Sequence, residues 1–232
     1  GDWTGRSTVD GLPASRGWPV MIVHGASGSP FVRKVLVALA IKEIPYEQIQ
    51  QLPLTRDAQY RKINPLGKIP TLQDGDLTIC DSTVICEYLE DTHPQPPLYP
   101  KSSADKARAR WHEELGGTRV AELAAGIFFQ RFMRPMVLKQ EPDEELVAKI
   151  INKQLPPILD YLESQVPAQG FIFGEFMIAD MSLMSPFVNA SYAGYEVDVA
   201  RWPAFGDFIA RVKAHPVVSQ VLAAEAASMG LK

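Results

Sequence analysis

Hydrophobic and polar positions follow two different periods in the first part of the chain, and this mixture ends near residue 95. Short apolar runs predict strands there, and apolar residues at three- and four-residue spacing predict helices. The predicted strands are 21–24, 46–50, 69–72 and 77–79, and the predicted helices are 30–42, 55–62 and 82–91. The order βαβαββα, with a hairpin at Asp74-Gly75, predicts an α/β domain over residues 21–92 that combines a parallel and an antiparallel strand pair.

The rest of the chain is expected to be helical. Four prolines within Thr92–Lys101 predict a stiff linker at 93–101, because proline fixes φ and supplies no backbone donor. No strand pattern follows, so residues 102–232 are expected to form an all-helical domain. Its first helix is expected to begin at Ser102, which forms a capping pattern with Asp105, and to run to about Gln130 or beyond, with Pro135 as its limit. Further helices are expected at 142–165, with an interruption near Pro156-Pro157, and at 179–193, 203–214 and 217–229.

Residues 1–20 show no periodicity and are expected to lie outside the fold, as a disordered arm or a remnant of cloning. Trp3 and Trp18 are unusual in a linker, so a docked arm stays open as the alternative.

Composition narrows the classes of function. Hydrophobic residues make up 46% and charged residues 22%, which is typical of a soluble globular protein. The net charge is 23 − 27 = −4, so the chain lacks the basic field that binding to nucleic acid or to an anionic membrane needs. The longest apolar run, Val35–Ile41, is far shorter than the roughly 20 residues of a membrane-spanning helix. We therefore expect neither a nucleic-acid partner nor a membrane.

Cysteine and histidine usage argues against a disulfide framework and a metal site. The two cysteines, Cys80 and Cys86, have neither redox-pair nor zinc spacing, and a reducing, cytoplasmic location is the default. The four histidines are scattered without ligand spacing, so no metal is expected.

A first candidate site lies in Gly25–Pro30, between a predicted strand and a predicted helix. Proline is favoured at the first helical position, which makes Ser29 the N-cap. In the simplest interpretation Ser29 only caps the helix. In the functional interpretation its hydroxyl and the positive end of the helix dipole stabilise an anion such as a thiolate.

A second candidate site is the stretch Asn64–Leu72, in which Pro70 enters a strand after a tight turn. Pro70 is a candidate for a cis peptide bond, and Ile69 could then pair with a bound peptide through its main chain. An ordinary edge proline, with Lys68 in solvent, is the alternative interpretation.

A third candidate site, Cys80–Ile85, again joins a strand to a helix start. Asp81 or Ser82 is expected to cap the helix. The same residues could hold a carboxylate on the free amides and the Ser82 hydroxyl, and an ammonium group on Asp81. Together the three sites suit a small, extended peptide that carries a thiol.

These residues, with the proline-rich linker and the helical second half, resemble the glutathione S-transferase family from about residue 21 to the C-terminus. The resemblance implies a thioredoxin-like first domain, glutathione bound as co-substrate at its edge, and a homodimer that acts in detoxification. It also implies roles for single residues. Ser29 would donate to the glutathione sulfur, Ile69 before the cis residue Pro70 would pair with the cysteinyl backbone, Arg56 and Lys68 would lie near the glycyl carboxylate, and Asp81 and Ser82 would hold the γ-glutamyl end.

Departures from the family pattern refine this hypothesis. The first loop has no tyrosine, and neither position 27 nor position 29 is cysteine, which favours a serine-type member over tyrosine- and cysteine-type members. Ser27 is a rival for the catalytic hydroxyl, and Ser29 is favoured because Pro30 places it at the helix start. Met177 replaces the usual Ser or Thr three residues before Asp180, so a reciprocal capping box is expected to be lost there.

The predicted function is conjugation of the glutathione thiolate to hydrophobic electrophiles. The electrophile site is expected between the domains, along the first long helix, with Trp111, Phe128, Phe132, Met133 and Met136 as candidates. The natural electrophile cannot be read from an apolar pocket. A glutathione-dependent peroxidase, isomerase or dehalogenase and a non-catalytic binding module on the same fold remain as alternatives.

Overall fold

The computed structural model describes residues 6–8 and 20–230. The described residues form two compact units. The first contains the described residues up to Leu98 together with those from Gln220 onward, and the second contains Tyr99–Ser219. The boundary after Leu98 falls inside the expected linker 93–101.

The first unit is built on a mixed five-stranded sheet in the order β1-β3-β2-β4-β5. Its strands are β1 (Arg6–Thr8), β2 (Met21–His24), β3 (Tyr46–Ile49), β4 (Thr71–Asp74) and β5 (Leu77–Cys80). The pair β2–β3 is parallel, and the other neighbouring pairs are antiparallel. The expected thioredoxin-like order βαβαββα is confirmed over β2 to α3, with β1 as an additional edge strand.

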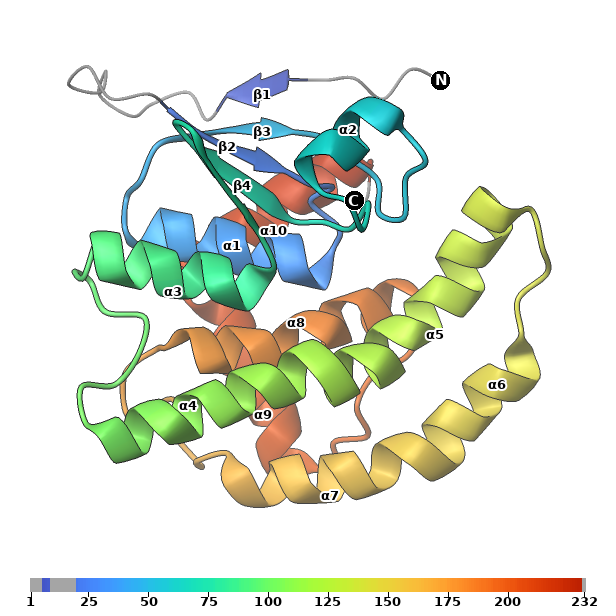
Figure 1. Ribbon diagram of the computed structural model, residues 1–232. Coiled ribbons are helices and arrows are strands. Elements are labelled where there is room, and N and C mark those ends of the chain that lie inside the picture. The colour runs from blue at the N-terminus through green and yellow to red at the C-terminus, as the bar shows by residue number, and fades with distance from the viewer. Residues whose placement is uncertain (1–5, 9–19, 231–232) are drawn as a thin grey trace. The chain divides into compact units, whose positions relative to one another are not determined.

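Three helices connect these strands: α1 (Pro30–Ile41), α2 (Ala58–Ile63) and α3 (Ser82–Thr92). Figure 1 shows α1 and α3 side by side on one face of the sheet. The core between helices and sheet is apolar and fully buried, and includes Val23, Val35, Leu39, Leu72, Ile85 and Leu89. Burial of about 25 cal/mol per Å² of apolar surface makes this layer the main source of the unit's stability.

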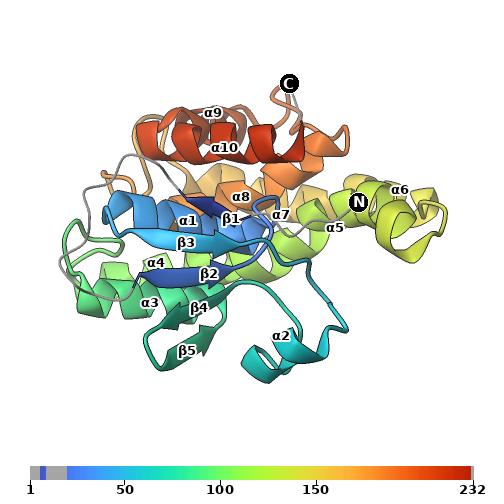
Figure 2. The same cartoon turned by 90° about the horizontal axis from the view of Figure 1, so that it is seen from above.

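Two segments differ from expectation. Arg6–Thr8 were expected to lie outside the fold, yet they pair with β3 in antiparallel register; Trp3 and Trp18 lie outside the described residues. The last helix, α10 (Pro216–Met229), was assigned to the helical domain, but from Gln220 onward it belongs to the first unit. Figure 2 shows this helix running alongside α1.

The second unit is entirely helical apart from two isolated bridges at 171–175. A continuous helical run consists of α4 (Ser103–Leu115), η1 (Gly116–Ala125), α5 (Gly126–Phe128) and η2 (Phe129–Leu138), where η marks π-helical stretches. The expected limit at Pro135 is wrong, because the run continues to Leu138 and ends at Lys139 with φ 55°. Pro135 lies inside η2, where it removes one backbone N–H donor without ending the helical run.

A second run consists of α6 (Glu144–Lys149), η3 (Ile150–Gln154) and α7 (Leu155–Gln165). The interruption expected near Pro156-Pro157 takes the form of η3, after which both prolines lie in the first turn of α7, where their missing N–H groups cost little.

The helix α8 (Ile178–Tyr192) is the core of the second unit, and α9 (Pro203–Ala214) packs against it. Every residue of α8 from Ile178 to Ala190 is buried, as expected for a helix surrounded by others. η1 crosses α8 closely at Gly116, where a Cβ would lie 2.4 Å from the Ser182 carbonyl oxygen. Among the described residues, no helix combines the length and hydrophobicity needed to cross a bilayer.

Candidate functional site

The three candidate sites meet at one end of the sheet. We call them the serine loop (Gly25–Ser29), the proline loop (Asn64–Pro70) and the aspartate turn (Cys80–Ser82). His24 at the end of β2 is in register with Thr71 at the start of β4, and Thr71 is in register with Cys80 at the end of β5. Since neighbouring strands lie about 4.8 Å apart, the three segments leave the sheet within roughly 10 Å of one another.

The serine loop ends in the N-cap of α1. Ser29 is the N-cap residue, and its Oγ accepts a long hydrogen bond of 3.4 Å from the Val32 N–H. The Ser29 hydroxyl proton has no acceptor among the described residues, and the side chain is partly exposed. Its O–H can therefore donate to an anion, in a place where the dipole of α1 also favours negative charge.

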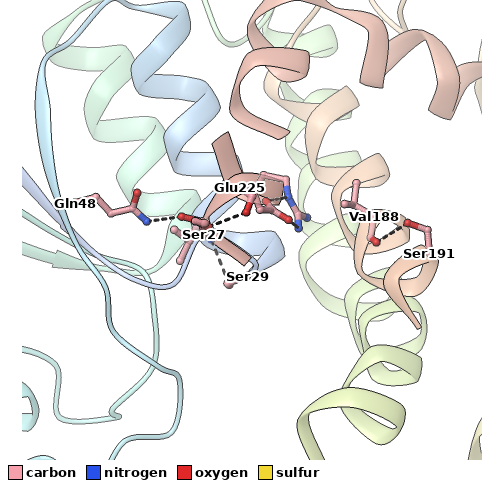
Figure 3. Close-up of polar contacts among 9 residues, drawn as sticks. Ser27, Ser29, Gln48, Val188, Ser191 and Glu225 are labelled. Carbon is pink, nitrogen blue, oxygen red and sulfur yellow. Dashed lines mark hydrogen bonds and ion pairs between the residues drawn. The ribbon is translucent and has the colours of Figure 1, made fainter. Parts of the chain in front are cut away.

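Ser27 lies deeper in the same loop and has a different environment. It is only 8% exposed, and its Oγ accepts a hydrogen bond from Gln48 Nε2 at 2.9 Å (Figure 3). The same Oγ accepts a longer hydrogen bond from Gln50 Nε2 at 3.4 Å. Both lone pairs of the Ser27 hydroxyl oxygen therefore accept hydrogen bonds from protein side chains, which fixes the position of Ser27. Ser29, by contrast, is partly exposed.

Gln48 is the residue of this loop that sequence reasoning missed. Its Nε2 donates to the Gly25 carbonyl oxygen at 2.9 Å as well as to Ser27, and its side chain is buried. Because a carbonyl oxygen can only accept, the nitrogen of the Gln48 carboxamide must face Gly25, and this fixes the orientation of the carboxamide. A polar residue at the inward position of a strand that leads toward the site is the signal that could have found it.

The proline loop is held in shape by a small buried network around Asn64. Asn64 Nδ2 donates to the Lys68 carbonyl oxygen at 2.9 Å and to Thr71 Oγ1 at 3.1 Å, and its Oδ1 accepts from the Leu66 N–H at 3.1 Å. The Tyr60 hydroxyl donates to the same Lys68 carbonyl at 2.6 Å. Burial of this tyrosine raises its pKa, so it stays a neutral donor.

Gly67 gives the proline loop its tight turn. Its φ is +62°, and a Cβ at this position would lie 2.8 Å from the Thr55 carbonyl oxygen. Glycine tolerates this φ and this close contact, whereas any other residue would be strained.

The end of the proline loop presents main-chain groups for a ligand, and Lys68 and Arg56 add two exposed cations. The Ile69–Pro70 bond is cis, as the sequence suggested. No backbone hydrogen bond joins Ile69 to another described residue. The side chains of Lys68 and Arg56 are exposed and make no hydrogen bond or ion pair with the described part of the chain. These groups can therefore bind a peptide main chain and a carboxylate.

The aspartate turn combines a cap with unused acceptor capacity. Asp81 has φ 112° and caps α3 through Oδ1, which accepts from the N–H groups of Thr83 at 2.8 Å and Val84 at 3.1 Å. The side chain is exposed, so Oδ2 can accept from an ammonium group. Ser82, the first residue of α3, is only 5% exposed and lies beside the free helix end.

The structure brings together only part of the candidate electrophile site. In the second unit Phe128 stacks on Phe132 with ring centroids 5.1 Å apart, and Phe128 also contacts Tyr192 edge-on at 6.4 Å. Trp111 is 52% exposed and donates to the Tyr161 hydroxyl at 3.0 Å. It precedes Phe128 by about 25 Å along the helix at 1.5 Å per residue, so it does not join this cluster.

Comparison with family models matches both parts of the chain. Residues 23–97 match the glutathione S-transferase N-terminal domain, and residues 128–225 match the glutathione S-transferase C-terminal domain. A glutathione S-transferase from Triticum aestivum is 31% identical over 192 residues, which is 78% of this chain and 83% of that protein.

Further relatives include isomerases and solved structures. A maleylacetoacetate isomerase from Pseudomonas aeruginosa is 30% identical over 81% of this chain and 88% of its own length. The crystal structure of a glutathione S-transferase from Rhodospirillum rubrum superposes with a TM-score of 0.78 at 25% identity, covering 88% of this chain and 92% of that one. With the family models matching most of the chain, this protein belongs to the glutathione S-transferase family.

Proposed function

We propose that this protein is a serine-type glutathione transferase that joins the glutathione sulfur to hydrophobic electrophiles. The observation that carries this proposal is Ser29, whose free hydroxyl stands at the N-terminus of α1 where the three loops meet. A free thiol has a pKa of about 8.5, and lowering it by two units requires roughly 2.7 kcal/mol. A charge-assisted hydrogen bond of about 1.5–3 kcal/mol, with the helix dipole, is of that size.

The rest of glutathione would extend across the other two segments. The main chain of Ile69 would pair with the cysteinyl residue as an added strand. Asp81 and Ser82 would hold the ammonium and carboxylate of the γ-glutamyl end, and Arg56 and Lys68 would bind the glycyl carboxylate.

The proposed reaction is nucleophilic. The thiolate attacks an electrophilic carbon and forms a C–S bond, while the electron pair of the bond that breaks leaves with the departing group or moves onto an acceptor group. Phe132, which is 40% exposed and stacks on the buried ring of Phe128, is the proposed apolar contact of the electrophile.

Paired serine variants test this assignment. Ser29→Ala should lower kcat by about 10- to 100-fold below pH 7 and move the pH profile upward, because the thiolate loses its donor, while glutathione affinity stays nearly unchanged. Ser27→Ala should cost less activity and more stability, because it leaves the Gln48 amide short of a buried acceptor. Full activity in Ser29→Ala would mean that this serine only caps α1.

A second candidate function is cis–trans isomerisation of an activated double bond, and the similarity to maleylacetoacetate isomerases favours it. In this reaction the thiolate adds to the double bond, the resulting single bond rotates, and the thiolate leaves again. The same serine would stabilise the thiolate, and no glutathione is consumed. Measuring glutathione during turnover separates the two. Conjugation consumes one glutathione per product, and isomerisation leaves its concentration constant.

We further propose that the protein acts as a cytoplasmic homodimer. Exposed apolar side chains on the first unit support this, since Leu66 is 64% and Val84 50% exposed. Light scattering coupled to gel filtration should give twice the chain mass, and a monomer at micromolar concentration would contradict it.

A further inference from the structure

A buried ion pair joins two segments of the first unit that lie 192 residues apart in the chain. Arg33 Nε and Nη2 each donate to one carboxylate oxygen of Glu225 at 2.6 Å. The two side chains are 0% and 1% exposed. A paired contact of this kind fixes orientation as well as distance, and loss of one partner removes a charge-assisted contact from a buried place.

Arg33 is also part of the start of α1. Its backbone N–H donates to the Ser29 carbonyl oxygen at 2.9 Å, which is the first hydrogen bond of the helix. Arg33 therefore contacts the serine loop through its main chain and α10 through its side chain.

α10 reaches the serine loop itself one turn beyond Glu225. A Cβ on Gly28 would lie 3.0 Å from Met229 Sδ and 3.5 Å from Met229 Cε. The thioether therefore covers Gly28, the residue between Ser27 and Ser29. Because methionine is a flexible side chain, it stays there only while α10 is held in place.

We propose that Arg33 and Glu225 are a positioning pair of the glutathione site. The pair holds the last turns of α10 against α1, so that Met229 covers Gly28 and the Ser29 hydroxyl keeps the place from which it donates. This inference rests on the proposed role of Ser29. It adds that a segment near the C-terminus, and not only the first domain, determines how well that serine works.

The test is a double-mutant cycle with a matched control. Glu225→Gln should lower kcat about tenfold, as a small misplacement of a catalytic group does, and leave the KM for glutathione unchanged. In a Ser29→Ala background it should cause no further loss. Amide hydrogen exchange should become faster in the peptide 25–32. Glu90→Gln is the control, because it removes the carboxylate partner of Lys42, one of three acceptors at the opposite end of α1, and should change neither kcat nor exchange in 25–32.

Two results would overturn the proposal: a folded Glu225→Gln protein with unchanged kcat and exchange, or an equal loss of kcat with and without Ser29. If Glu225→Gln does not fold, Arg33→Lys keeps the charge but loses the paired contact, and a loss of about threefold that depends on Ser29 supports the proposal. Unchanged kcat in that variant overturns it.

If the unmodified protein shows no glutathione-dependent turnover, the proposed function fails. In that case amide hydrogen exchange of peptide 25–32 in Glu225→Gln is the remaining test. Faster exchange supports a positioning role of the pair, and unchanged exchange overturns it.

Discussion

At the scale of single residues, the site depends on side chains that hold the backbone as much as on those that would touch a ligand. Gln48 binds two groups of the serine loop, and Asn64 binds two groups of the proline loop and the Thr71 hydroxyl of β4. Each is buried, so each of these hydrogen bonds forms where water cannot replace it. The conformation of both loops therefore rests on two carboxamides.

Gln48→Met tests this at the serine loop. The change keeps the length of the side chain but removes the Gln48 hydrogen bonds to the Gly25 carbonyl and the Ser27 hydroxyl, of which the Ser27 hydroxyl keeps only the longer bond from Gln50. The free energy of unfolding should therefore fall by about 1–3 kcal/mol. Activity should fall as well. Urea unfolding and kcat measure the two effects. Gln51→Met is the control, since Gln51 makes only an exposed contact, with the Leu52 carbonyl. Equal stability of both variants would contradict the role of Gln48.

At the scale of elements, the start of α8 carries a buried carboxylate. Asp180 Oδ2 accepts from the Met177 N–H at 2.8 Å and Oδ1 accepts from the Ile172 N–H at 3.0 Å. The start of this helix therefore holds although Met177 stands where a hydroxyl residue is usual. Burial raises the pKa of Asp180 to about 6, against the opposite effect of these hydrogen bonds.

This raised pKa predicts a pH dependence of stability. Between about pH 4 and pH 6 the folded protein binds the Asp180 proton more tightly than the unfolded chain does. The contribution of Asp180 to stability should therefore fall as pH rises through this window, by roughly 3 kcal/mol in all, and level off above it. Asp180→Asn should remove this slope in urea unfolding measured at several pH values. Asp207→Asn, at an exposed position of α9, should keep it; a slope unchanged in Asp180→Asn would contradict the assignment.

At the scale of the whole molecule, the chain leaves the first unit through a segment held by one lysine. Lys42 Nζ donates to Glu90 Oε2 at 2.8 Å, to the Pro96 carbonyl oxygen at 2.9 Å and to the His93 carbonyl oxygen. The end of α1 thus fixes the chain after α3, where the sequence predicted stiffness from proline alone.

Lys42→Met should release this segment. Three contacts are lost, so proteases should cleave near 93–98 faster than in the unmodified protein, and unfolding free energy should fall by about 3 kcal/mol. Limited proteolysis with mass spectrometry locates the cuts. Lys62→Met, which loses only an exposed contact with Gln59, should leave the cleavage rate unchanged. Unchanged cleavage in Lys42→Met would assign the stiffness to the prolines.

Local sequence patterns predicted most of the helices and strands and the positions of the three loops. Ser29 as N-cap, the turn before Pro70 and the cap at Asp81 follow from short-range backbone chemistry, which a single sequence displays. The contacts of Glu225 and Lys42 are long-range, because they depend on which elements become neighbours, and no local signal marks them. For Gln48 the inward position on a strand marks the residue, but its partners are known only from the structure. Trp111 and Phe128 share a helix in the sequence, but only the structure shows that they lie too far apart to form one site.

The ion pair between Arg33 and Glu225 also has a consequence for the order of protein synthesis. A ribosome that has just added Arg33 needs roughly 10–40 s to add the next 192 residues, at about 5–20 residues per second. During that time the Glu225 carboxylate is not yet available to the Arg33 guanidinium. Although its sheet lies within residues 6–80, this unit is completed only after α10 has been synthesised.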